Sequence, residues 1–172
     1  MLHPATPRQG LILCEEEASC AQWGSLRSTW ARRGPPPEGT TSGTRTGYKV
    51  FGAMASGSGR LFSAGLAGRV TAESAQACLQ TILAHTTAPL FLIHEGARYH
   101  TSPATQPFLQ GHGERITAHP LPSYAPDDNP MAYLGRKTKK RATHNTSFKE
   151  CAALTVSVDK AWAYGATHPE TV

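Results

Sequence analysis

The sequence has no long hydrophobic run and no closely paired cysteines. No apolar stretch in the 172 residues approaches the ~20 that a membrane-spanning helix needs, so we expect no membrane span. The four cysteines form no CxxC pair, and their even number alone does not argue for disulfides in a chain of this length, so we expect reduced thiols. The amino-terminal stretch "MLHPATPRQG" lacks the features of a secretory signal peptide, so we expect a cytoplasmic protein.

What the sequence does have is a moderate excess of positive charge. There are 17 lysines and arginines against 12 acidic residues, giving a net charge of +5. A basic surface of this size permits an anionic partner such as nucleic acid, although charge alone selects none.

Hydrophobic periodicity and turn residues predict alternating strands and helices. The expected elements are a strand from Leu11, a hairpin over 48–68, a helix over 71–86, a strand over 89–94, a helix from about Thr101, a strand over 116–121, and helices from Pro130 and over 148–164. Pro107 should kink or end the helix from Thr101, and Gly135 should weaken the one from Pro130. This order predicts one α/β domain with a mixed sheet flanked by helices.

Carboxylates follow two of these apolar strands. In "FLIHEGARYH" (91–100) the strand leads to Glu95, and in "LILCEEEAS" we expect it to end on the three glutamates 15–17. Because the ends of adjacent central strands meet at one edge of a sheet, Glu16 and Glu95 should lie side by side. Paired carboxylates suit Mg²⁺, whereas the alternative is that both are solvated loop residues.

Four stretches together resemble a known family. They are "CEEEAS" with "STWARRG", "YKVFGA" with "GRLFSAGLAGR", "LFLIHEGARYHTS", and "LPSYAPDDNPMAYLGRKTKKRATHN", in that order between residues 11 and 145. They resemble the catalytic domain of bacterial insertion-sequence transposases of the mariner superfamily. The resemblance implies an RNase H-like fold, a DDE or DDD metal-binding triad, Mg²⁺ or Mn²⁺ as cofactor, and cleavage and transfer of DNA strands.

The resemblance implies an altered triad in this chain. The family's first acid matches Glu16, with Glu17 as its neighbour, the second matches Glu95, and the third matches Ala132. Each Asp-to-Glu change displaces a carboxylate by ~1 Å, a misplacement that can cost ~100-fold in rate. We therefore expect weak metal binding by Glu16 and Glu95 and impaired or absent activity.

Other residues could neighbour this site. His100 matches the family's histidine after the second acid, and Asp127 and Asn129 lie in the loop before the helix from Pro130. Asp127 or Asp128 could replace the missing carboxylate, or could simply stabilise a turn. A zinc site at the histidines around Gly96 lacks further ligands at suitable spacing, and no cysteine is spaced to form a Cys-His nucleophile.

The stretch "GRKTKKRA" predicts a positive helix face. Its exposed members would be Arg136, Lys137, Lys140 and Arg141. Such a face suits a phosphate backbone, and the alternative is an ordinary solvated surface. The resemblance places it near the third triad position and implies transposon-end DNA as its partner.

The resemblance also suggests a domain division. Residues 1–10 would be an amino-terminal stub and 11–165 the catalytic domain, with too few residues ahead of it for the family's helix-turn-helix module. The chain would then be a fragment, a truncated reading frame or one half of a frameshift product. The family further implies a homodimer. An alternative function is a non-catalytic remnant that binds DNA or an intact transposase, and a third possibility is a decaying copy without function.

Overall fold

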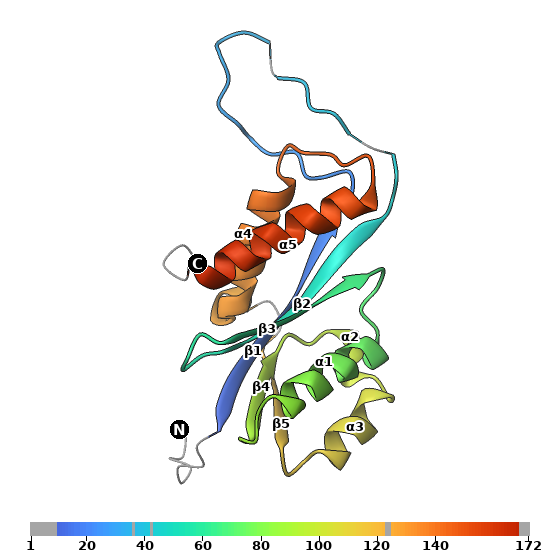
Figure 1. The fold of residues 1–172 in the computed structure, drawn as a ribbon, viewed down its shortest axis with the longest axis vertical. Helices are drawn as coiled ribbons and strands as arrows, with labels where there is room; N and C mark the ends of the chain where they lie inside the picture. The colour runs from blue at the N-terminus through green and yellow to red at the C-terminus, as the bar shows by residue number, and fades with distance from the viewer. Residues whose placement is uncertain (1–9, 36, 42, 123–124, 169–172) are drawn as a thin grey trace. The chain divides into compact units, whose positions relative to one another are not determined.

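A five-stranded sheet with the strand order β3-β2-β1-β4-β5 organises the chain (Figure 1). The computed structural model describes residues 10–35, 37–41, 43–122 and 125–168, so the predicted stub at 1–10 lies outside the described residues except for Gly10. Parallel pairs join β1 to β4 and β4 to β5. The strands are β1 (Leu11–Ala21), β2 (Gly47–Ala55), β3 (Leu61–Ala67), β4 (Leu90–His94) and β5 (Ile116–Pro120).

The helices follow β3, β4 and β5 along the chain. They are α1 (Ala72–Ala84), α2 (Arg98–Thr101), α3 (Thr105–Gly111), α4 (Pro130–Thr143) and α5 (Cys151–Thr167), with a short 3-10 helix η1 (Pro126–Asp128) before α4. The predicted start of α1 is confirmed. The Thr71 hydroxyl accepts a hydrogen bond from the Ser74 N–H at 3.3 Å, and the Ser74 hydroxyl accepts one from the Thr71 N–H at 2.9 Å.

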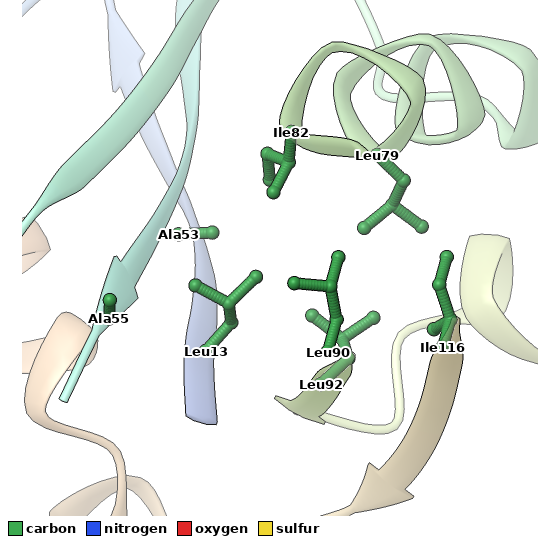
Figure 2. Close-up of a cluster of buried hydrophobic side chains, with 8 residues drawn as sticks. All are labelled: Leu13, Ala53, Ala55, Leu79, Ile82, Leu90, Leu92 and Ile116. Carbon is green, nitrogen blue, oxygen red and sulfur yellow. The ribbon is translucent and has the colours of Figure 1, made fainter. Parts of the chain in front are cut away.

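The chain divides into two compact units, the first formed by residues up to Glu16, 51–64 and 70–132. Its core packs α1 against the strands, as Figure 2 shows for Leu79 and Ile82 of α1 above Leu90 and Ile116. These side chains recur at helical spacing on α1, which explains why periodicity predicted this helix. The core holds in place β1, which carries Glu16, and β4, which leads to Glu95.

The second unit comprises residues 17–50, 65–69 and 133–172, of which the structure describes those up to 168. Helix α5 buries Leu154, Val158 and Trp162, and the Ser157 hydroxyl donates to the Ala142 carbonyl of α4 at 3.1 Å. The Tyr48 hydroxyl donates to Asp159 at 2.9 Å; burial, together with this carboxylate, raises the pKa of Tyr48 to about 12. Strand β2 and helices α4 and α5 are thereby held together.

Two local expectations were wrong. The helix expected from Thr101 is two helices, and Pro107 is the third residue of α3, where no intrahelical N–H bond is required. Pro107 therefore neither kinks nor ends a helix. Strand β1 does not end at its glutamates but continues to Ala21, so these acids lie in the middle of a strand.

Gly24 is required by the turn that follows β1. Its φ is +71°, and a Cβ there would lie 1.9 Å from the Thr146 carbonyl oxygen. We expect Gly24→Ala to lower the free energy of unfolding by about 2–4 kcal/mol, because it combines backbone strain with a backbone clash. Urea denaturation measures this change. The control, Gly43→Ala, meets nothing within 4 Å and should change stability by less than about 0.5 kcal/mol; equal losses in both variants would contradict the argument.

Candidate active site

The three glutamates of β1 occupy different environments. Glu15 is 2% exposed, whereas Glu16 and Glu17 are half-buried. Because side chains alternate along a strand, Glu15 and Glu16 point to opposite faces of the sheet. Glu17 forms an ion pair with Lys49, with 2.5 Å between Oε1 and Nζ. Of the three glutamates, Glu15 alone is fully buried.

The strand register is consistent with the expected pairing of Glu16 and Glu95. Pairs run from Leu11 with Leu90 to Cys14 with Ile93, a constant offset of 79 residues. The same offset, continued two residues further, matches Glu16 with Glu95. Glu95 follows β4 directly and is exposed. The role of both residues as metal ligands remains a prediction.

Asn129 joins the start of α4 to β1. Its side-chain amide donates to the backbone carbonyl of Glu15 at 2.8 Å, and its Oδ1 accepts from the Met131 N–H at 3.1 Å. Ala132 follows in the first turn of α4 and is 6% exposed. The candidate third position is thus next to a fixed anchor on β1, yet its side chain is a buried methyl group with no metal-binding atom.

Glu15 forms a buried polar cluster that the sequence did not predict. Its Oε2 pairs with His100 Nε2, and its Oε1 accepts from the Tyr99 hydroxyl at 3.2 Å. The His94 ring centroid lies 4.1 Å from that of His100. The period of two that makes Leu13 buried also puts Glu15 on the same face, and this was the signal available in the sequence.

The two histidines are held as structural groups in this cluster. His94 Nδ1 lies 2.8 Å from the Glu95 backbone carbonyl, so this nitrogen carries the proton and donates it. Burial lowers the pKa of His94, with a further lowering from His100, against the opposing effect of the hydrogen bond to Glu95. His100, expected near the triad, contacts Glu15 instead.

The described residues do not form a metal site of the expected kind. Asp127 and Asp128 are exposed on η1, and among the residues that the structure describes no group of three or more His, Cys, Asp or Glu side chains is arranged to hold a metal ion. A three-carboxylate site for Mg²⁺ or Mn²⁺ is therefore not fitted by these residues. Burial also raises the pKa of the Cys14 and Cys20 thiols, which disfavours a nucleophilic thiolate.

The predicted basic face on α4 is exposed. Arg136, Lys137, Lys140 and Arg141 all lie at its surface, while Leu134 and Thr138 between them are buried. The Arg141 guanidinium carbon lies 3.7 Å from the centroid of the Tyr164 ring on α5. This face offers positive charge for a polyanion such as DNA.

The family is decided by a match over most of the chain. The family model described as DDE superfamily endonuclease matches residues 12–155. The chain belongs to the DDE superfamily endonucleases. A comparison with curated proteins found no match. The resemblance to a DDE transposase domain is therefore confirmed.

Solved structures show the same fold in mariner transposases. The chain is similar to the Mos1 paired-end complex with Mg (TM-score 0.67, 16% identity, 90% of this chain and 48% of that chain). It is also similar to the Mos1 paired-end complex with left transposon end (0.65, 15%, 88% and 47%) and to the Mos1 catalytic domain with raltegravir and Mg (0.57, 13%, 91% and 77%). The chain spans about half the length of the first two transposase chains. The predicted RNase H-like α/β fold is confirmed.

Among the described residues, no helix combines the length and apolar character needed to cross a membrane.

The Glu15–His100 pair should contribute strongly to the stability of this DDE domain. We expect Glu15→Ala to lower the free energy of unfolding by about 3–5 kcal/mol, because it leaves a buried histidine without its partner. In the same strand, Glu17→Ala removes a half-exposed pair and should cost no more than about 1 kcal/mol. Urea denaturation compares the two.

Replacing both partners by apolar residues tests whether the loss in Glu15→Ala comes from an unpaired buried group. The double variant Glu15→Leu with His100→Leu should recover most of the stability lost by Glu15→Ala, since neither buried polar group is left unpaired. A loss in Glu15→Ala no greater than that in Glu17→Ala would refute this account of the cluster.

Proposed function

We propose that the chain is the catalytic domain of a transposase that retains a DNA-binding surface but has lost most or all metal-dependent strand cleavage. The proposal rests on Ala132, which is a buried methyl group at the position that the family resemblance assigns to the third acid. A divalent ion held by three carboxylates would normally position the attacking water and the phosphodiester. Here residues 11–165 would supply only two of those carboxylates.

The remaining acids are poorly placed to replace the missing ligand. Glu15 is engaged by His100 and Tyr99, and Asp127 and Asp128 lie on exposed η1. Mg²⁺ requires nearly ideal octahedral geometry, so two lengthened carboxylates without a third ligand should bind it weakly. Mn²⁺ would be the better probe because it is less demanding.

The exposed cations of α4 support the DNA-binding part of the proposal. They would contact phosphates of transposon-end DNA, and such contacts position a protein without reading bases. By analogy with the paired-end complexes, we propose action as a homodimer on two DNA ends, in the cytoplasm. The domain would hold DNA beside a weakened catalytic centre.

A non-catalytic role is the second candidate. A protein with Ala132 in place of a ligand and with an intact basic face could occupy transposon ends, or pair with an active transposase, and so inhibit transposition. Metal-dependent cleavage separates this role from residual catalysis.

Metal binding is the first prediction for the proposed function. Calorimetric titration of Mn²⁺ should show little or no binding to the native chain and clear binding to a variant with Glu16→Asp, Glu95→Asp and Ala132→Glu. The restored variant supplies three carboxylates at the geometry that the family uses. Cleavage of a transposon end in Mn²⁺ should follow the same order.

A charge-matched control addresses non-specific binding. Adding one carboxylate at exposed α5, as Ala152→Glu, should not create a metal site. Native-chain binding equal to that of the restored variant, or normal Mg²⁺-dependent cleavage by the native chain, would overturn the proposed loss of activity.

DNA binding should depend on the face of α4. The double variant Lys137→Glu with Lys140→Glu should bind DNA more weakly and lower the slope of log affinity against log salt by about 2, since two phosphate contacts are lost. Fluorescence anisotropy at several salt concentrations measures both. The control variant Lys149→Glu with Lys160→Glu makes the same charge change at exposed positions outside α4, and an equal effect there would remove the special role of α4.

A further inference from the structure

A cavity of about 380 Å³, open to solvent on one side, is lined by α4 and α5 in the second unit. Leu134 and Ala161 form its apolar part, and Lys137, Lys140 and Arg141 line it with positive charge. This volume lies in the range of ~300–1,000 Å³ that small-molecule sites occupy. The cavity therefore combines room for a small ligand with three cations.

These cations have no acidic partner within the described part of the chain. No ion pair involves Lys137, Lys140 or Arg141 there. Three like charges within two turns of one helix repel one another, which destabilises the protein when the cavity holds no anion. An anion in the cavity would remove this repulsion.

Arg141 is held in place by an aromatic stack. Its guanidinium lies 3.7 Å from the Tyr164 ring centroid, and the His168 ring stacks on Tyr164 with centroids 4.0 Å apart and an interplanar angle of 11°. Stacking restrains the guanidinium while its N–H groups remain able to donate. A restrained guanidinium is suited to two parallel hydrogen bonds with a phosphate.

Thr138 lines the same cavity and behaves differently from other helical threonines. Its hydroxyl is buried, with the residue 1% exposed, and it has no hydrogen-bond partner among the described residues. Four of the other threonines in the helices donate to the carbonyl four residues earlier at 2.9–3.1 Å: Thr81, Thr143, Thr155 and Thr167. A buried, unpaired hydroxyl is costly, and rotation of the Thr138 side chain toward the cavity would let a ligand oxygen pair it.

We propose that the α4–α5 cavity binds a phosphate group, with Lys137, Lys140 and Arg141 as charged contacts and the Thr138 hydroxyl as a neutral donor. This inference deepens the proposed function, on which it rests for its natural source, a phosphate of the DNA backbone. Tyr164 is a positioning residue that acts through Arg141. The site needs no metal ion, and it extends DNA contact from the exposed surface of α4 into the space between two helices.

The first experiment titrates inorganic phosphate into the full chain without divalent metal, followed by ³¹P NMR or calorimetry. We expect Thr138→Val and Arg141→Gln each to weaken phosphate binding by about tenfold, the effect of losing one hydrogen bond to a charged ligand. The matched controls are Thr155→Val, which removes a paired hydroxyl on α5, and Lys149→Gln, which removes a cation outside the cavity. Both should bind phosphate as the native chain does.

Thermal unfolding shows whether weaker phosphate binding in a variant comes from a lost contact or from a less stable protein. Thr138→Val should unfold at the same or a higher temperature than the native chain, because the lost hydroxyl had no partner in the protein. Weaker phosphate binding in a variant of undiminished stability then reports a lost ligand contact. Failure of the native chain to bind phosphate, or native-like binding by Thr138→Val and Arg141→Gln, would overturn the proposal.

A second arm identifies the source of the phosphate. Affinity for single-stranded DNA is measured for the same variants in EDTA. Parallel losses for phosphate and DNA support the DNA backbone as the ligand, whereas loss for phosphate alone supports the site with a free phosphate or mononucleotide as its source. Because this experiment needs neither metal nor cleavage, its failure is distinguishable from failure of the catalytic proposal.

Discussion

The parallel pairing of β1 with β4 is the constraint on which the candidate site depends. It sets the backbone positions of Glu16 and Glu95 at one end of the paired segment, and the core beneath it holds both strands in place. The buried amide of Asn129 then brings the start of α4 to the same strand. Strand β1, the end of β4 and the start of α4, to which the family resemblance assigns the triad, are therefore fixed in position.

The backbone at the predicted site is held in place by residues other than the predicted metal ligands. The buried residues around the site, such as Leu13 and Leu92, stabilise the sheet whatever acid stands at its end. The buried methyl group of Ala132 packs without any polar group to satisfy, so it carries no desolvation penalty in folding.

The sequence predicted the elements better than the side-chain environments. The cap at Thr71 and the periodicity of α1 are local signals, and they succeeded because the local preference and the packed structure agree. The predicted end of β1 was wrong because three consecutive glutamates are typical of an exposed strand end. The partners of buried Glu15 are residues 99 and 100, which lie far away in the sequence. Pro107 was misjudged because its effect depends on where α3 begins. Short stretches of sequence do not predict contacts between distant residues or the exact residue at which a helix begins.

The run of three glutamates has a consequence for the register of β1 in the sheet. A shift by one residue would put Glu16 where Glu15 now lies, with the same carboxylate facing His100, so this stretch alone does not distinguish one alignment from the next. The distinction comes from its neighbours: Leu13 and Ala18, both 0% exposed, would be turned to the opposite face by such a slip. The apolar side chains on either side of the three glutamates thus determine which of these identical residues is buried.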